Sequence, residues 1–231
     1  MESHIPLLVS LLISASAFST EINNDFNKPD SEWFDIYQSP PDGCEGYTVY
    51  RGEFRIKDNA LATDPANPQE KEIVLESFKT PLSKGTDFKA SVDFMIPEQW
   101  DESGSGLALG ILFNYTGTPG DRRNFNCIRF RADGSRQTIQ FLAIGNQEQI
   151  RGENMSSGLL LIPGKWYTLS ITCDEFPSLK YSLSEVGSEK TTLASGNVNL
   201  AGLSCDKGSI ALQVFGESEV LFDNFSASLS K

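Results

Sequence analysis

The chain has 231 residues, with 31 acidic side chains, 19 basic side chains and a formal net charge of −12. This acidic balance argues against a nucleic-acid partner, because phosphate binding needs clustered Lys and Arg, and against an anionic membrane surface. The single histidine, His4, lies within an apolar N-terminal targeting segment. The expected mature chain therefore has no histidine for a Ser-His-Asp triad or a His-ligated zinc site.

The targeting segment is the first predicted element. Residues 5–17 read IPLLVSLLISASA, an apolar run of signal-peptide length followed by small residues that suit a signal peptidase. We predict a signal peptide over residues 1–19, with an uncleaved anchor as the alternative. No later apolar stretch approaches transmembrane length, so we expect a secreted protein, extracellular or periplasmic, that does not insert into a membrane.

The remaining residues, 20–231, read as a single all-β domain. Apolar and polar side chains alternate with a period of two, as in Phe88–Ile96, and Asp133-Gly134 between two such runs is a hairpin signal. Ten or more short strands, each with one apolar face, need a second sheet to cover that face, which predicts a two-sheet antiparallel β-sandwich. The other runs are 107–114, 126–132, 138–144, 166–173, 180–186, 209–215 and 219–229.

Four cysteines in an exported chain suggest two disulfides, for which three pairings are possible. We favour Cys173–Cys205, because Cys173 ends one apolar strand and Cys205 precedes another, and Cys44–Cys127 by elimination. Free buried thiols are the alternative. No C-x-x-C pair occurs, which disfavours redox or metal chemistry at these residues.

Two segments carry a resemblance to a known family. The run Gly164-Lys165-Trp166-Tyr167-Thr168-Leu169-Ser170-Ile171 and the ending Val220-Leu221-Phe222-Asp223-Asn224-Phe225 resemble concanavalin A-like lectin/glucanase jelly rolls, especially the laminin-G-like branch. The resemblance covers most of the expected mature chain and implies a jelly-roll fold. It leaves function open, because such folds host lectins, carbohydrate-binding modules, glucanases, lyases and adhesion domains. The E-x-D-x-x-E strand of the glucanases is absent.

The first candidate site is a polar sheet face. If the large apolar residues of the middle strands point into the core, their polar neighbours share the opposite face. Arg, Gln and Asn side chains there suit sugar hydroxyls or a uronate carboxylate, although a solvated face with Asp–Arg pairs is the alternative. The candidate residues are Asp93, Asn114, Arg129, Arg131 and Gln140.

Two aromatic side chains, Trp100 and Tyr115, sit beside turn-rich segments where a ring could stack on a sugar. Packing inside a loop is the alternative for each.

A cation site is the other candidate. Asp25 lies in a polar segment near the expected mature N-terminus, and Asp223 interrupts an apolar strand near the C-terminus. In many relatives of the resembled family the first and last strands are neighbours, and calcium is held by such oxygens. Calcium prefers six to eight oxygen ligands. We therefore expect these two strands to pair and a structural calcium to be possible, with polar turn residues as the alternative.

These observations favour an exported, non-catalytic carbohydrate-binding domain whose partner is a glycan or polysaccharide. Two alternatives stay open: a polysaccharide-active hydrolase or lyase that works without histidine, and a structural adhesion module. No catalytic residue is assigned, and the oligomeric state is not determined by the sequence.

Overall fold

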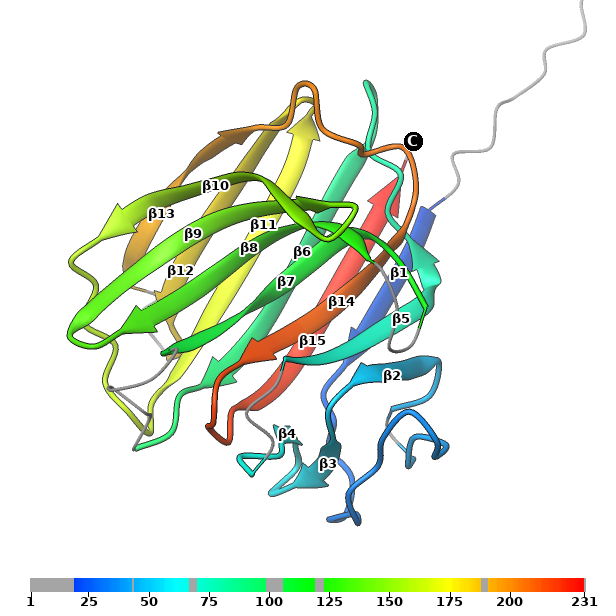
Figure 1. Ribbon diagram of the computed structural model, residues 1–231, viewed down its shortest axis with the longest axis vertical. Helices are drawn as coiled ribbons and strands as arrows, with labels where there is room; N and C mark the ends of the chain where they lie inside the picture. Colours follow the sequence, from blue (N-terminus) through cyan, green and yellow to red (C-terminus); the bar gives the residue numbers. More distant parts are fainter. Residues whose placement is uncertain are drawn as a thin grey trace, which may run out of the picture.

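The computed structural model describes residues 19–42, 44–66, 70–98, 106–118, 123–187 and 191–230. Two antiparallel sheets lie face to face, and the described residues contain no helix, which confirms the predicted all-β sandwich (Figure 1). No part of the described chain qualifies as a membrane-spanning helix. The predicted signal peptide, apart from Ser19, and Trp100 lie outside the described residues.

The eight-stranded sheet has the order β13 (Thr192–Asn199), β12 (Ser178–Glu185), β11 (Trp166–Glu175), β6 (Asp87–Met95), β15 (Leu221–Ser230), β4 (Ala60–Thr63) and β3 (Phe54–Lys57), and β1 (Ser19–Asn24) also pairs with β15. The seven-stranded sheet has the order β10 (Glu148–Ser157), β9 (Arg136–Gly145), β8 (Asn124–Asp133), β7 (Leu107–Thr116), β14 (Ser209–Phe215), β5 (Lys71–Lys79) and β2 (Tyr47–Arg51).

The main core lies between the sheets. The inward residues of the strands are mostly large and apolar. The ring of Phe94 from one sheet stacks on that of Phe130 from the other, with centroids 6.1 Å apart, and lies 6.0 Å from the ring of Tyr167. Since alternate side chains of a strand point to opposite faces, the same alternation that fills this core presents a second set of side chains to the outside of each sheet.

The strands at the two ends of the chain are neighbours. β1 pairs antiparallel with β15, with Asn24 opposite Phe225, and the two strands run side by side in Figure 1. The predicted pairing of these strands is confirmed. A register shift follows Asp223, where Asn224 adopts a positive φ of 47°. This β-bulge lets Phe222 and Phe225 both face the core, although an uninterrupted strand would point them to opposite sides.

The predicted disulfides are wrong in this structure, in which all four cysteines are free and buried. Cys44 belongs to the core between the sheets, whereas Cys127 lies in an apolar cluster on the outside of the seven-stranded sheet, so these two thiols are separated by the sheet. Cys173 and Cys205 both face the main core as thiols, and Asn126 donates a hydrogen bond to the Cys205 sulfur at 3.5 Å. Burial raises the pKa of both thiols to about 11.

Candidate functional site

The outer face of the seven-stranded sheet carries a row of residues that crosses every strand and is polar on all of them except β7, where the member is a glycine. The antiparallel registers place one residue of each strand directly opposite the next. From β10 to β2 the row reads Asn154, Gln140, Arg129, Gly110, Gln213, Glu72 and Arg51. Because neighbouring strands lie about 4.8 Å apart, a row across seven strands spans roughly 29 Å.

One end of the row is a chain of hydrogen bonds between neutral and cationic groups. The Nε and Nη2 atoms of Arg129 donate to Gln140 Oε1 at 2.8 and 2.6 Å, and Gln140 Nε2 donates to Asn154 Oδ1 at 3.3 Å. Burial lowers the pKa of the Arg129 guanidinium. Gln140 thus fixes the plane of the half-buried guanidinium without neutralising its charge.

The other end of the row is built around a fully buried carboxylate, Glu72. Its oxygens accept hydrogen bonds from Gln213 Nε2 at 2.9 Å, from the Tyr115 hydroxyl at 2.9 Å and from Arg123, and Arg51 lies 3.6 Å away. Arg123 also binds Glu70. A buried carboxylate is stable only when it is paired and hydrogen-bonded in this way. Glu72 therefore holds the surrounding side chains of this face in position.

An apolar floor lies beside this row on the same outer face. Eight residues form a buried cluster there, with Leu112, Cys127 and Leu142 in the next row across β7, β8 and β9. The Tyr115 ring stacks on Phe125, with centroids 6.1 Å apart, and meets Tyr50 edge-on at 5.4 Å. These side chains are almost fully buried, with Tyr50 7% and Tyr115 3% exposed, so they contribute packing and only a small apolar area to the outer face.

A pocket of about 470 Å³ opens next to these rings. Tyr50 and Tyr115 line its inner part, and Glu76, Lys79 and Lys207 stand at its exposed border. The Tyr50 hydroxyl donates to Glu76 Oε1 at 2.7 Å, and burial raises the pKa values of both tyrosines. The volume lies within the range of pockets that hold small organic ligands, and its mixed donors and acceptors suit a hydroxyl-rich molecule.

The structure separates the predicted site residues into three groups. Arg129, Arg131 and Gln140 share the outer face described above, and Tyr115 lines its pocket. Asp93, predicted on the same face, instead lies on β6 of the other sheet, where its Oδ1 accepts a hydrogen bond from Thr168 Oγ1 at 2.6 Å. That prediction is wrong because alternation along a strand gives the face of a residue and not the sheet to which the strand belongs.

Asn114 is also misplaced by the prediction. It sits at a register shift in β7 with φ of 53°, and its buried amide donates to the carbonyl oxygens of Thr80 and Cys205. Its Oδ1 accepts a hydrogen bond from Asn126 Nδ2 at 3.2 Å. Asn114 therefore connects β7 to the segments that contain Thr80 and Cys205. The bulge at Asn114 also places the Tyr115 side chain on the outer face.

The two residues predicted for calcium, Asp25 and Asp223, lie close enough for their charges to interact. Asp223 lies opposite Asp93, and the Asn224 amide donates to both carboxylates at 3.3 and 3.0 Å. The described residues contain no group of three or more His, Cys, Asp or Glu side chains placed to hold a metal ion. Burial, together with the charges of Asp93 and Asp25, raises the pKa of Asp223.

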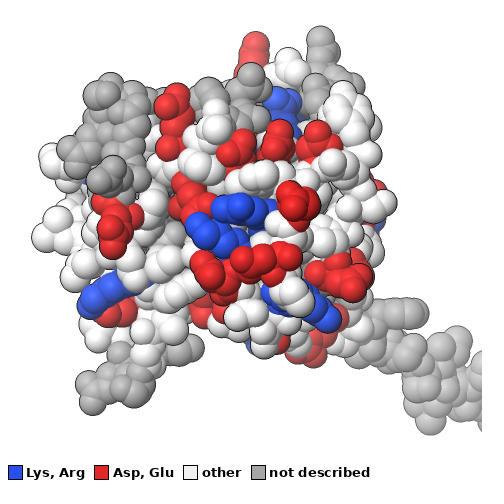
Figure 2. Space-filling view, turned by 90° about the horizontal axis from the view of Figure 1, so that it is seen from below, with Lys and Arg blue, Asp and Glu red and all other residues white. Residues whose placement is uncertain are grey.

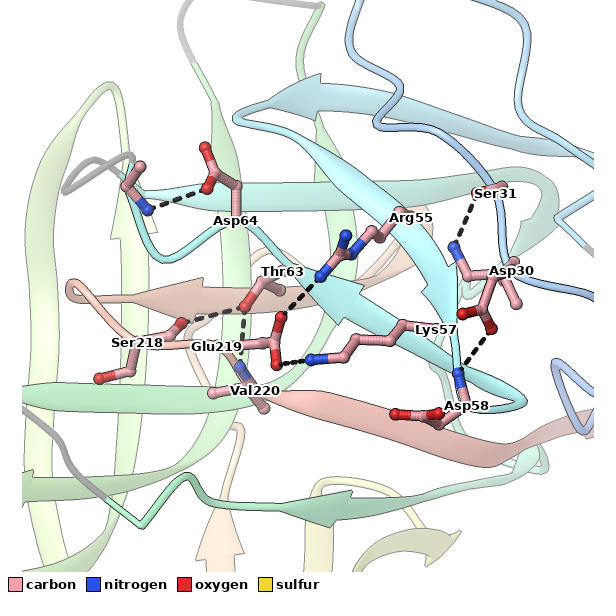
Figure 3. Close-up of polar contacts among 12 residues, drawn as sticks. Asp30, Ser31, Arg55, Lys57, Asp58, Thr63, Asp64, Ser218, Glu219 and Val220 are labelled. Atoms are coloured by element: carbon pink, nitrogen blue, oxygen red, sulfur yellow. Dashed lines mark hydrogen bonds and ion pairs between the residues drawn. The ribbon is translucent and has the colours of Figure 1, made fainter.

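A separate charged cluster occupies the end of the sandwich near β3 and β4. Seen from that end, Lys and Arg gather in a compact group ringed by acidic side chains (Figure 2). Arg55 and Lys57 both bind Glu219, at 3.2 and 2.5 Å (Figure 3). The guanidinium of Arg55 also lies 4.3 Å from the centroid of the Trp33 ring. Glu219 is shared by the two cations, so this cluster links β3 to the segment before β15.

Sequence reasoning missed Glu72, Gln213 and Tyr50. Glu72 lies in an almost continuous buried run, Lys71–Leu75, in which alternation is not visible. Gln213 is the single polar residue inside the apolar strand β14, and that isolation is the signal that could have marked it.

No protein-family model matches the sequence, and no curated protein matches it. Among solved structures, the basic winged bean lectin with Tn-antigen is similar with a TM-score of 0.59 and 12% identity over 93% of this chain and 99% of that one. Peanut lectin with a nine-residue peptide gives 0.58 and 9%, over 94% and 98%. The acidic winged bean lectin complexed with methyl-α-D-galactose gives 0.57 and 12%, over 93% and 99%.

These likenesses define the class of fold. The chain is a lectin-like β-sandwich that shares the concanavalin A-like jelly roll of the legume lectins.

Proposed function

We propose that this chain is an exported, non-catalytic carbohydrate-binding domain whose saccharide site is the outer face of the seven-stranded sheet. The observation that carries the proposal is the pocket of about 470 Å³ beside Tyr50 and Tyr115, on a face that combines an apolar floor with a polar row. Sugars present apolar C–H faces and many hydroxyls, so rings beside amide, carboxylate and ammonium groups are suitable partners.

Two further features support the proposal. The solved structures with this fold include a winged bean lectin in complex with methyl-α-D-galactose and a Bauhinia forficata lectin in complex with GalNAc. The carboxylate at the centre of the face, Glu72, is buried and engaged by Arg123, Gln213 and Tyr115, which suits a supporting role better than acid–base catalysis. Within the jelly-roll class, we propose the laminin-G-like branch on the strand motif at residues 164–171.

A glycan array tests the proposal. The protein from residue 20 onward should bind at least one saccharide, and Glu76→Ala with Lys79→Ala should weaken that binding about tenfold, because two hydrogen bonds contribute roughly 1–3 kcal/mol. Both residues are exposed at the pocket border, so the fold should tolerate the change.

The matched control is an exposed Lys–Glu pair on the other sheet, Lys165 and Glu185, whose charged atoms are 2.7 Å apart. Lys165→Ala with Glu185→Ala should leave binding unchanged. Equal losses in the two double variants would contradict the placement of the site, and no binding to any saccharide would contradict the function.

A further inference from the structure

The two halves of the polar row differ in charge. On the β5 and β2 half, Arg51 and Arg123 are paired with Glu72, and Arg123 also with Glu70. On the β8–β10 half, no ion pair links Arg129 to any carboxylate of the described residues, and its two hydrogen bonds go to the neutral Gln140. A half-buried guanidinium with a neutral partner is unexpected in a chain of net charge −12.

A second hollow lies at this half of the face. It has a volume of about 230 Å³, and Arg131, Arg136, Thr138 and Gln140 are among the residues that line it. Asp133 supplies the one carboxylate of this lining, and it lies 3.3 Å from Arg131. Arg129 is hydrogen-bonded to Gln140 of this lining, so three arginines and one aspartate lie in or beside the hollow.

The side chains around this hollow favour an oxyanion as the ligand. A guanidinium presents parallel N–H donors that match the two oxygens of a carboxylate or sulfate, and such charge-assisted hydrogen bonds are about twice as strong as neutral ones. Thr138 and the amide of Asn154 add groups that suit sugar hydroxyls. Gln140 holds the Arg129 fork in place through two hydrogen bonds, which reduces the entropy lost when a ligand binds.

We propose that the hollow at β8–β10 is an anion subsite, so that the ligand of this face is an acidic saccharide carrying carboxylate or sulfate groups. This inference rests on the proposed function, because it concerns a second part of the same face. Carboxylate and sulfate groups are both oxyanions, and the experiment below distinguishes between them.

The test compares paired ligands by calorimetry: oligogalacturonate against its methyl ester, and a sulfated oligosaccharide against its desulfated form. In the protein from residue 20 onward, the acidic member of at least one pair should bind about tenfold or more tightly than the neutral member, since each charge-assisted bond is worth roughly that factor. The pair that shows the difference identifies carboxylate or sulfate as the preferred group.

Arg129→Gln with Arg131→Gln should remove the difference, so that the acidic and neutral members bind alike. Arg131→Gln with Arg136→Gln is the second variant, because both side chains are at least partly exposed and their loss should not disturb folding. Lys180→Gln, an exposed lysine on β12 paired with Asp174, is the control for loss of positive charge and should keep the difference.

Equal binding of both members of each pair by the unaltered protein would overturn the anion subsite while leaving the proposed function in place. A preference that survives in both arginine variants would also overturn it. Absence of binding to every saccharide on the array and in these pairs would overturn the proposed function, and this inference with it.

Discussion

At the scale of single residues, the candidate site depends on how Glu72 is neutralised. Arg123 is its closest cationic partner, and the carboxylate has no exposed surface. Arg123→Ala should lower the free energy of unfolding by about 3 kcal/mol, because removing one partner leaves a buried charge under-compensated. Urea denaturation measures this value.

The control for this change is Lys89→Ala, which removes an exposed lysine 3.3 Å from Asp87. Exposed pairs contribute about 0–1 kcal/mol, so its effect should be small. If Arg123→Ala were no more destabilising than Lys89→Ala, Glu72 would not depend on Arg123.

The raised pKa of Asp223 predicts that the stability of the fold depends on pH. Burial is the largest cause of its raised pKa, followed among the raising effects by the charges of Asp93 and Asp25. Because the folded pKa lies above the ordinary value of 3.8, the folded state holds this proton more tightly than the unfolded state. Stability from this group is therefore present below pH 3.8 and lost as the pH rises through the folded pKa.

Asp223→Asn should consequently raise the Tm at pH 7, and the gain should vanish below about pH 3.8. Asp174→Asn is the control, and it should not raise the Tm at pH 7. A hydrogen bond from Lys180 lowers the pKa of Asp174, so its charged form is favoured in the folded state. Thermal melts at pH 3 and pH 7 measure both. A gain at pH 7 from Asp174→Asn, or none from Asp223→Asn, would contradict this account of the acidic pair.

At the scale of strands, the close approach of β7 and β8 shapes the middle of the polar row. A Cβ atom on Gly110 would clash with the Ile128 carbonyl oxygen and lie 2.6 Å from Arg129 Cβ. Gly110→Ala should therefore force the strands apart, lower the free energy of unfolding by about 1–3 kcal/mol and weaken saccharide binding through the displaced Arg129.

Gly187→Ala is the control, since no atom of the described residues lies within 4 Å of an added Cβ there and its φ is not in the left-handed region. Denaturation and calorimetry report the two effects. A Gly110→Ala protein as stable as the Gly187→Ala protein would show that β7 and β8 are not in such close contact.

The strands also show how far alternation in a sequence can be trusted. It predicted which residues of β8 and β9 point outward, including Arg129 and Gln140, because neither strand is interrupted along that stretch. It failed at Asn114, where a bulge with positive φ shifts the alternation by one residue, and Tyr115 lies outward as a result. A bulge of this kind depends on tertiary hydrogen bonds, here to Thr80 and Cys205, which local sequence does not display.

At the scale of the whole molecule, the sandwich was predictable because many half-apolar strands require two sheets. The partner of each strand was not, since β6 pairs with β11 and β15, which lie far along the chain. That long-range pairing is what removes Asp93 from the face of Arg129.

The free thiols give a further prediction for the whole molecule. All four cysteines are buried, and burial raises the pKa of Cys127 to about 12, so no reactive thiolate should form at neutral pH. A thiol reagent should label none of the four in the native protein and all four in guanidinium without reductant, and dithiothreitol should leave the Tm unchanged. Fewer than four thiols after unfolding would indicate a disulfide.

The most direct test of the central claim is an NMR titration of the isotope-labelled protein with the saccharide that binds best on the array. Chemical-shift changes should concentrate on the outer face of the seven-stranded sheet, at Tyr50, Tyr115, Arg129 and Gln140. Ser170 and Ser182, neighbours on β11 and β12 of the other sheet, should not change. Changes confined to that other sheet, with none around Tyr115 and Arg129, would contradict the proposed site.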